Sequence, residues 1–374
     1  MKFSIAANCG RARAGILDVG GHSIPTPVFM PIGTRGSVKT VSNAELEALG
    51  AKLILGNAYH LYLRPGQELI GRLGGLHEFT GWRGAYLTDS GGYQVFSLKT
   101  LNDVDDGGVS FQSHIDGSRH RFTPAGVIDI QVALGAEIIM PLDVCSPFPV
   151  DERTSDSDMR RTVRWAGESF RHFDSRGSQG QTLFAIVQGS IYVDQRLQCL
   201  EEVLKLEPPG LSIGGLSVGE PKEERTRVLK NIMPHFPDEL PRYLMGVGTP
   251  EDIIEAVALG ADMFDCVMPT RNARNGTLFT RFGRMIIKAA RYADDSRPID
   301  SECSCQACGG YARAYIRHLL SVGEILGFRL ATLHNLHFYL DMMRQIRESI
   351  SESRFESFSR RFLENLSLGV EQLT

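Results

Sequence analysis

The chain has 374 residues, of which 42% are hydrophobic and 22% are charged, a composition that excludes an intrinsically disordered protein. Its 40 basic and 44 acidic residues give a net charge of −4, so nucleic-acid binding would require a local basic patch. No apolar run is long enough to cross a bilayer, and residues 1–15 lack the apolar segment of a signal peptide. We therefore expect a cytoplasmic protein with no membrane partner.

Short apolar runs that end abruptly at Gly, Asp, Asn or Gln recur along the chain, over residues 28–34, 53–57, 85–92, 138–144, 183–189, 211–215, 243–248 and 263–269. Such runs are typical of strands that are buried on both faces of a parallel sheet. Helical patterns separate most of them, over residues 43–50, 123–135, 151–173, 194–206, 222–233 and 249–260. Ser42 followed by Glu45 has the spacing of a capping box, and Thr249-Pro250 is a typical helix start.

Strands alternating with helices predict an α/β fold, a (β/α)8 TIM barrel, over residues 1–280. A doubly wound open sheet is the alternative, because periodicity does not reveal whether a sheet closes. Residues 95–122, with Asp116-Gly117 as a turn, are predicted to form a β-hairpin inserted after the third strand. We predict that residues 281–374 form a zinc-binding subdomain and C-terminal helices packed on the barrel.

The metal site is predicted from three cysteines in six residues, Cys303, Cys305 and Cys308. In a cytoplasmic chain this spacing favours tetrahedral zinc over disulfides. A histidine from a following helix would complete a closed, structural site, and the candidates are His318, His334 and His337. A catalytic zinc is the minor alternative, since it would leave a position for water.

Acid or amide side chains end several predicted strands: Asp89, Asp143, Gln188 and Asp265. The C-terminal ends of barrel strands carry the chemistry in this fold. Two carboxylates there can act as nucleophile and general acid/base on a glycosidic bond, and an Asp with a Gln can bind the edge of a base. Each residue alone could also be a cap or a turn. Their repetition at strand ends favours an active site, where Tyr93 and Met245 offer stacking faces unless they belong to the core.

Residues 266–293 contain no Asp or Glu but carry Arg271, Arg274, Arg281, Arg284, Lys288 and Arg291. A solvated charged surface would explain such residues. The absence of acids directly after Asp265 instead favours a patch that binds the phosphates of RNA or DNA.

Several motifs resemble the tRNA-guanine transglycosylase family, in order along nearly the whole chain: TDSGGYQ from Thr88, PLDVC from Pro141, VQGS from Val187, GGLSVGE from Gly214, MGVGTP from Met245, FDCVMPTRNARNG from Phe264 and the CxCxxC…H set. The resemblance implies a zinc-containing (β/α)8 barrel that exchanges guanine for a 7-deazaguanine at the wobble position of tRNAs for Asp, Asn, His and Tyr.

The resemblance also implies a role for each matching residue. Asp265 corresponds to the nucleophile and Asp89 to the general acid/base. The base-recognition groups correspond to Asp143, Gln188, Gly215 and Leu216, with Tyr93 and Met245 on either side of the ring. The zinc ligands correspond to Cys303, Cys305, Cys308 and His334.

Val218 and Cys145 resemble the bacterial form of the family, which inserts preQ1 (7-aminomethyl-7-deazaguanine). Queuine as the base is the alternative. Two further alternatives are a glycosidase for small nucleosides and a non-catalytic tRNA-binding subunit. The resemblance also implies a homodimer.

Overall fold

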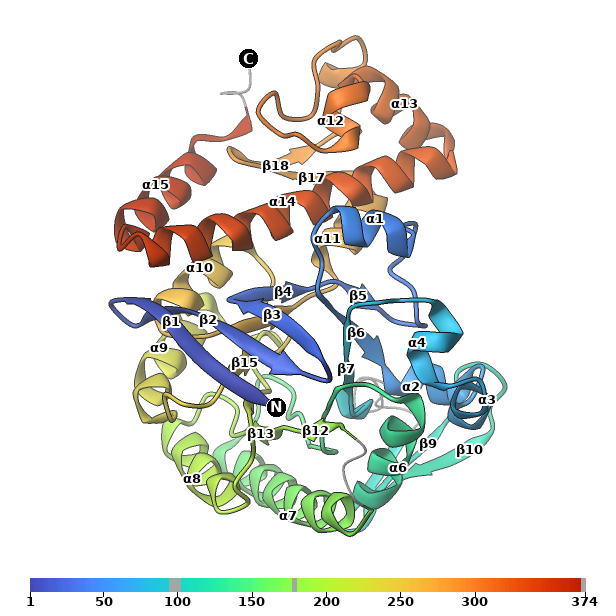
Figure 1. Ribbon diagram of the computed structural model, residues 1–374, viewed down its shortest axis with the longest axis vertical. Coiled ribbons are helices and arrows are strands. Elements are labelled where there is room, and N and C mark those ends of the chain that lie inside the picture. The colour runs from blue at the N-terminus through green and yellow to red at the C-terminus, as the bar shows by residue number, and fades with distance from the viewer. Residues whose placement is uncertain (94–101, 177–179, 371–374) are drawn as a thin grey trace.

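The computed structural model describes residues 1–93, 102–176 and 180–370 (Figure 1). Parallel strands form two five-stranded sheets. One sheet contains, in spatial order, β12 (Thr182–Leu183), β11 (Ile138–Ile139), β7 (Ala85–Asp89), β6 (Leu53–Asn57) and β5 (Ile32–Gly33). The other contains β13 (Ala185–Val187), β14 (Leu211–Ile213), β15 (Arg242–Leu244), β16 (Met263–Asp265) and β4 (Val28–Met30).

The two sheets are joined through two chain segments. In each segment one residue divides a continuous strand into two halves, and each half pairs in a different sheet. Pro31 alone separates β4 from β5, and Phe184 alone separates β12 from β13. The order of parallel neighbours is therefore cyclic, with eight positions, as the (β/α)8 prediction requires. It is not the order of the doubly wound open sheet that we considered as the alternative.

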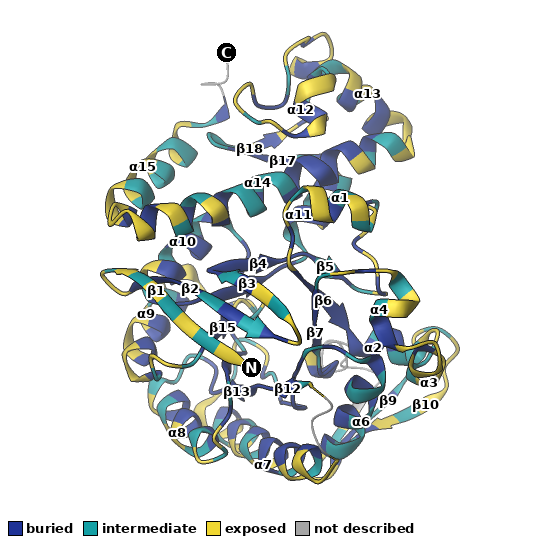
Figure 2. Ribbon diagram, viewed as in Figure 1, coloured by how far each residue is buried: buried dark blue, intermediate teal, exposed yellow. Residues whose placement is uncertain are grey.

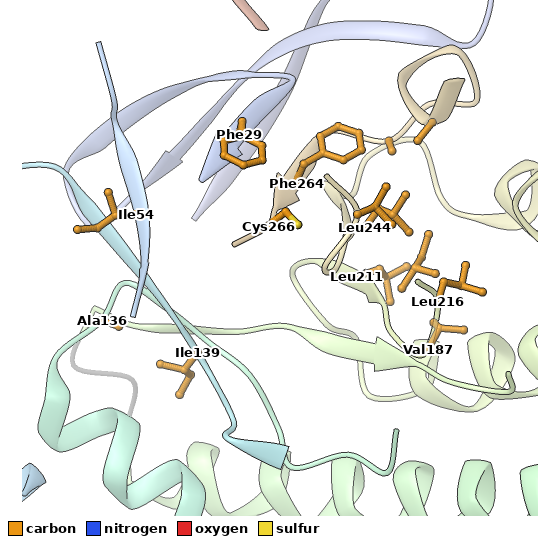
Figure 3. Packing of buried hydrophobic residues seen from close by; sticks show 14 of the residues in the cluster. Phe29, Ile54, Ala136, Ile139, Val187, Leu211, Leu216, Leu244, Phe264 and Cys266 are labelled. Atoms are coloured by element: carbon orange, nitrogen blue, oxygen red, sulfur yellow. The ribbon is translucent and has the colours of Figure 1, made fainter. Parts of the chain in front are cut away.

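Side chains alternate between two hydrophobic clusters along each strand, as the twofold period of a strand requires. In β6, Leu53 and Leu55 belong to the cluster inside the ring of strands, whereas Ile54 belongs to the larger cluster beneath the helices. Figure 3 shows members of the larger cluster, including Phe264 and Leu244, packed together. The alternation determines which residues at a strand end face the interior.

Helices follow the strands and cover the outside of the sheet with their buried faces (Figure 2). They are α1 (Asn43–Ala48), α2 (Ala58–Leu63), α3 (Gln67–Arg72), α4 (Gly75–Thr80), α6 (Pro124–Leu134), α7 (Glu152–Arg176), α8 (Val193–Leu204), α9 (Lys222–Ile232), η1 (Met233–His235), α10 (Pro250–Ala258) and α11 (Met268–Asn275). The predicted starts are confirmed: Ser42 and Glu45 form the capping box of α1, and Thr249 caps α10 with Pro250 in its first turn.

The segment inserted after β7 differs from the predicted hairpin. Its described part is a three-stranded antiparallel sheet of β8 (Asn102–Asp105), β9 (Gly108–Gln112) and β10 (Arg119–Phe122). The predicted turn at Asp116-Gly117 does join β9 to β10, and Gly117 has a positive φ of 74°. Strand β8 was not predicted as a separate strand, because its sequence, NDVD, contains only one apolar residue. Residues 95–101 of the predicted hairpin lie outside the described residues.

An antiparallel sheet at the N-terminus was not predicted. It contains β1 (Lys2–Cys9), β2 (Ala12–Val19) and β3 (His22–Thr26). Its residues Leu17, Val19 and Ile24 share a hydrophobic cluster with the first residues of four barrel strands, namely Leu53, Ala85, Ile138 and Met263. This sheet therefore closes the N-terminal end of the barrel and leaves the C-terminal end for the site.

The C-terminal part of the chain lies against one side of the barrel, at the top of Figure 1. It contains β17 (Thr277–Thr280), β18 (Gly283–Ile286), η2 (Ala290–Tyr292), α12 (Gln306–Gly310), α13 (Arg313–Val322), α14 (Ile325–Ser351) and α15 (Phe355–Leu368). A separate hydrophobic cluster stabilises it. The division at residue 280 stays a prediction and falls in the turn between β17 and β18. Among the described residues, no helix has the length and apolar character needed to span a bilayer.

Candidate active site and metal centre

Asp265 is the last residue of β16 and lies on the strand face that points into the barrel, as Met263 does. Its Oδ1 accepts a hydrogen bond from the Tyr243 hydroxyl (2.6 Å) and one from the Gly246 N–H (2.8 Å). Within the described part of the chain, no hydrogen bond is made to its Oδ2. Burial raises the pKa of Asp265, and the two hydrogen bonds oppose that effect by stabilising the ionised form. One oxygen is thus positioned while the other is available for reaction.

Asp89 ends β7 and is held at the start of α2. Its Oδ2 accepts a hydrogen bond from the Asn57 side-chain amide (2.8 Å) and its Oδ1 accepts one from the Ala58 N–H (2.9 Å). Asn57 ends the adjacent strand β6, pairs directly with Asp89 in the sheet, and caps α2. Asp89 lies on the same strand face as Ala85 and Leu87, which point into the barrel, and burial together with the charges of Asp265 and Asp89 raises the pKa of Tyr243.

Asp143, four residues after β11, and Gln188, directly after β13, form a buried pair. The Gln188 side-chain amide donates to Asp143 Oδ2 at 2.6 Å, and the Ser90 hydroxyl, next to Asp89, lies 3.4 Å from Asp143 Oδ1. Burial raises the pKa of Asp143 to about 6, although the hydrogen bonds from Gln188 and Ser90 oppose the rise. An acid of this pKa exchanges protons readily near neutral pH.

Gly215 lies directly against this pair. A Cβ on Gly215 would lie 2.2 Å from Gln188 Oε1, and its φ of +63° is unfavourable for other residues. Leu216 is buried in the larger hydrophobic cluster. Glycine is therefore required here so that the backbone can approach the Gln188 amide.

Tyr93 and Met245, the two residues predicted to stack on the base, differ in how far they are buried. Tyr93 is 56% exposed and lies next to residues 94–101, which are outside the described range. Met245 is partly buried against the inner cluster and follows β15. Both residues follow barrel strands, at their C-terminal ends, and the described residues record no contact between the two side chains.

The predicted basic residues do not form one uniform patch. Arg281 pairs with Asp300 and Glu302, so its charge is largely compensated. Arg271 is exposed on α11, and Arg284 and Lys288 are exposed near β18. Arg274 is partly buried and donates to the Thr270 carbonyl.

Sequence reasoning missed two basic residues near this helix, Arg35 and Lys39. Both are exposed and follow β5 in the chain. The strand just before β5, β4, pairs with β16, which ends at Asp265. Burial, followed by the charges of Arg274, Arg35 and Arg271, lowers the pKa of Lys39. Lys39 therefore lies in the positive field of Arg35, Arg271 and Arg274, and α11 begins three residues after Asp265. No local sequence signal marks Arg35 and Lys39 as part of this group, because they lie far from α11 in the sequence.

Tyr243 and Arg196 are two further residues that the sequence did not single out. Arg196 is fully buried and donates to the carbonyls of Ser190, Val187, Gly214 and Gly215. It ties the loop after β13 to the loop after β14, and so positions Gln188 and Gly215. Tyr243 was recognisable only as the inward residue of a short strand.

The cysteine cluster is confirmed as a group able to hold a metal ion: Cys303, Cys305, Cys308 and His334. The three sulfurs lie 3.3–3.7 Å from His334 Nδ1. Ligands of a tetrahedral zinc, about 2.3 Å away for sulfur and about 2.0 Å for nitrogen, lie about 3.5 Å from each other. The other ring nitrogen, Nε2, is 2.8 Å from the Phe279 carbonyl, which fixes the ring.

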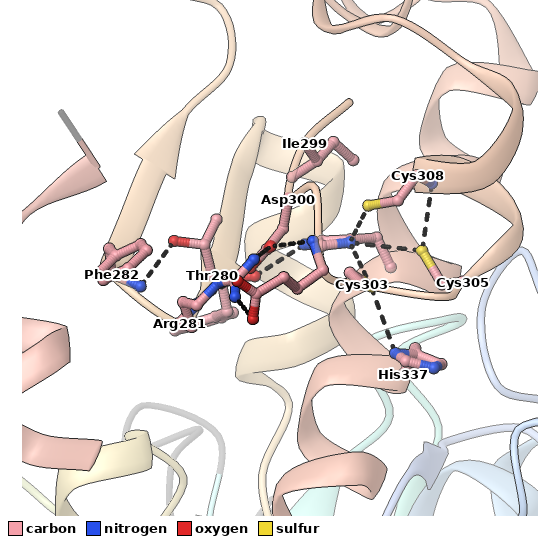
Figure 4. A network of polar contacts seen from close by, with 12 residues as sticks. Thr280, Arg281, Phe282, Ile299, Asp300, Cys303, Cys305, Cys308 and His337 are labelled. Atoms are coloured by element: carbon pink, nitrogen blue, oxygen red, sulfur yellow. Dashed lines mark hydrogen bonds and ion pairs between the residues drawn. The ribbon is translucent and has the colours of Figure 1, made fainter. Parts of the chain in front are cut away.

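The competing histidines fit this cluster less well. His337 Nδ1 reaches only Cys303, at 3.5 Å, while its Nε2 faces the Ser304 hydroxyl. His318 is exposed on α13 and lies outside the cluster. Figure 4 shows the cysteines beside the Arg281–Asp300 pair, with His337 at the edge. The geometry therefore favours His334 as the fourth ligand.

Comparisons with known proteins agree over nearly the whole chain. A family model described as queuine tRNA-ribosyltransferase matches residues 8–367. A queuine tRNA-ribosyltransferase of Thermoanaerobacter sp. (strain X514) is 50% identical over 351 residues, 94% of this chain and 93% of that protein. Proteins of the same name from Chromobacterium violaceum and Herminiimonas arsenicoxydans are 49% identical over 362 residues and 50% identical over 367 residues. These alignments cover 97% of this chain, and 97% and 98% of the respective relatives.

Proposed function

The chain belongs to the queuine tRNA-ribosyltransferase family, whose members are tRNA-guanine transglycosylases, and from this premise we propose the details of its reaction. It exchanges guanine at the wobble position of GUN-anticodon tRNAs (Asp, Asn, His and Tyr) for preQ1, a step of queuosine biosynthesis. Since tRNA is the substrate, we place the enzyme in the cytoplasm, and we expect the homodimer that the family resemblance implies.

Asp265 is the proposed nucleophile. Its Oδ2 attacks the anomeric carbon of the ribose, the glycosidic bond to guanine breaks, and a covalent ribosyl ester forms. The base must leave the anticodon stack for this attack. The incoming 7-deazaguanine then attacks the same carbon and releases the carboxylate, so two inversions retain the configuration. The observation that carries the proposal is the buried Asp265, with one oxygen held by two donors, at the same barrel end as the Asp143–Gln188 pair.

Asp89 is the proposed general acid/base for the departing and arriving bases. Hydrogen bonds from Asn57 and the Ala58 N–H fix its carboxylate at the C-terminal end of β7, the barrel end that also carries Asp265, and this position supports the proposed role. Proton transfer to the leaving guanine neutralises the charge that develops as the bond breaks. The same group accepts a proton when the new base attacks, so the enzyme returns to its starting state.

Asp143, Gln188 and the backbone at Gly215 and Leu216 are the proposed base-recognition groups. Asp143 offers oxygens to the N–H groups on the pyrimidine edge of the base, and Gln188 or a backbone N–H can donate to its carbonyl. Gly215 leaves room for this approach. Tyr93 and Met245 are proposed to contact the two faces of the ring.

The tRNA backbone is proposed to contact Arg271 and Arg274, together with Arg35 and Lys39 on the adjacent loop. The charges of the three arginines act on Lys39, and α11, which carries Arg271 and Arg274, begins three residues after Asp265; both observations support this proposal. Phosphates near a flipped nucleotide would lie in such a field. Arg284 and Lys288 extend the proposed contact toward the metal cluster, whereas the charge of Arg281 is already paired.

The metal is proposed to be one structural Zn2+, because three thiolates and an imidazole fill a tetrahedral shell. When bound, it links the loop of Cys303 to α14, which carries His334. Cys303→Ser should lower the metal content to below one equivalent and lower the melting temperature. A normally folded variant with unchanged zinc content would contradict a structural role.

Base exchange is tested by incubating the protein with unmodified tRNA-Tyr and labelled guanine, with unlabelled preQ1 or queuine as competitor. We expect incorporation that preQ1 suppresses. Suppression by queuine alone would overturn the inference from Val218 and Cys145. Hydrolysis of free nucleosides would favour the small-nucleoside glycosidase, and tRNA binding without either reaction would favour the non-catalytic subunit.

The role of Asp265 is tested with Asp265→Asn, which should abolish incorporation and leave zinc content unchanged. The matched control is Asp174→Asn, on the exposed side of α7, which should retain full activity. An active Asp265→Asn protein would refute the proposed nucleophile.

A further inference from the structure

Three potential metal ligands meet at the opposite end of the barrel from the proposed active site. They are His22, the first residue of β3, His77 of α4, and Glu137, which directly precedes β11. One ligand atom from each lies within 4.8 Å of the others. We propose that His22, His77 and Glu137 form a second metal site, separate from the cysteine cluster, for a divalent transition-metal ion.

His77 is oriented as a metal-binding histidine usually is. Its Nδ1 lies 2.9 Å from the Trp82 carbonyl, so this nitrogen carries the proton and donates to the backbone. Without an ion, Nε2 donates a hydrogen bond to Glu137 Oε1 at 2.8 Å, so metal binding would replace this proton with the ion and keep the same two ligand atoms in place. Two ligand atoms about 2.0 Å from an ion lie about 2.8 Å apart in an octahedral site and about 3.3 Å apart in a tetrahedral one, so these two atoms need to move little to share an ion.

Glu137 is also fixed from outside the site. Its Oε2 accepts a hydrogen bond from the Tyr86 N–H at 2.7 Å, while Oε1 faces His77. Tyr86 is near the beginning of β7, and Asp89 is three residues further along the same strand. At about 3.3 Å per residue, the proposed metal site lies about 10 Å or more from the reacting carboxylates.

His22 is brought to the pair by the turn between β2 and β3. The turn packs closely on Glu137, since a Cβ on Gly20 would lie 2.2 Å from the Glu137 Cγ. Gly20 has a φ of +56°, which permits this approach. The rings of His22 and His77 are nearly parallel, with centroids 6.1 Å apart and an angle of 17° between their planes. Both imidazoles are half-buried, so an ion can reach them from solvent.

The donor set points to the class of ion. Two imidazole nitrogens and one carboxylate oxygen suit Zn2+, Ni2+, Co2+ or Cu2+, whereas Mg2+ and Ca2+ prefer oxygen ligands. Three protein ligands leave positions for water. A bound ion would join the N-terminal sheet to α4 and to the start of β11, three segments that are distant in sequence. It would therefore stabilise the closed N-terminal end of the barrel.

Metal stoichiometry tests the proposal on the full-length protein. The zinc-loaded protein is dialysed against micromolar Zn2+ or Ni2+ and its metal content per chain is measured. We expect two equivalents for the wild type and one for His22→Ala or Glu137→Gln. The single remaining equivalent identifies the cysteine cluster, and base exchange by His22→Ala should be unchanged.

The matched control is His172→Ala. His172 Nε2 lies 2.8 Å from Asp129 Oδ1, but this pair has no third ligand among the described residues. The control should keep two equivalents. A wild-type content of one equivalent would overturn the proposal, and so would two equivalents in a folded His22→Ala protein. A rise in melting temperature with Ni2+ in the wild type, lost in His22→Ala, is the second expected result.

Discussion

Tyr243→Phe tests the positioning of the proposed nucleophile. The variant removes one of the two hydrogen bonds to Asp265 Oδ1 and leaves the Gly246 N–H in place. A hydrogen bond to a buried charged group is worth about 1.5–3 kcal/mol. That loss corresponds to a roughly ten- to hundredfold higher proton affinity of the carboxylate. The phenol ring is retained, so packing inside the barrel changes little.

The sign of the effect follows from the contacts of Asp265. Burial raises its pKa, and the hydrogen bonds from Tyr243 and Gly246 lower it. Removal of the Tyr243 hydroxyl takes away one of the two hydrogen bonds that lower the pKa of Asp265. The effect of burial then dominates more strongly, so the pKa of Asp265 rises further. Because the proposed attack requires the ionised carboxylate, the acid limb of the pH–rate profile should move to higher pH. Activity at high pH should recover in part.

The assay is the rate of guanine incorporation into tRNA between pH 5 and 9, for wild type and variant. Tyr86→Phe is the control, because Tyr86 is also fully buried in a barrel strand but its hydroxyl contacts Thr80. The control should lose some stability and keep the wild-type acid limb. An acid limb in Tyr243→Phe that coincides with that of the wild type would refute this reasoning.

Three further predictions concern recognition. Burial raises the pKa of Asp143 to about 6, so the folded protein loses stability as the pH rises from about 4 to about 6. In Asp143→Asn the melting temperature should change less over this interval, while base affinity falls about tenfold or more. Gly215→Ala should raise the KM for the base about tenfold, because the new Cβ would displace Gln188 and the positive φ disfavours alanine; an unchanged KM would contradict the close approach. Arg271→Ala should weaken tRNA binding and reduce its salt slope by about one, as measured by filter binding, whereas Arg281→Ala should have a smaller effect because two carboxylates already pair with it.

Local sequence patterns determined much of this protein. The apolar runs predicted the parallel strands, and Ser42, Thr123 and Thr249 marked helix starts that the structure confirms. These signals are readable because a strand buried on both faces and a helix cap depend on neighbouring residues. The cysteine spacing likewise predicted the metal cluster, since a tight loop brings its three sulfurs together.

Only the tertiary structure decided which distant groups meet. Residue patterns alone left the strand order and the choice between His334 and His337 open, although the family resemblance implied a barrel and His334. The hydrogen bond from Tyr243 to Asp265 depends on contacts between segments far apart in the chain, and nothing in the sequence indicated it. The pairing of Arg281 with Asp300 similarly removes a charge that composition alone had assigned to nucleic acid. Such contacts leave no periodic signal, because each is set by how whole elements pack and not by the residues beside it in sequence.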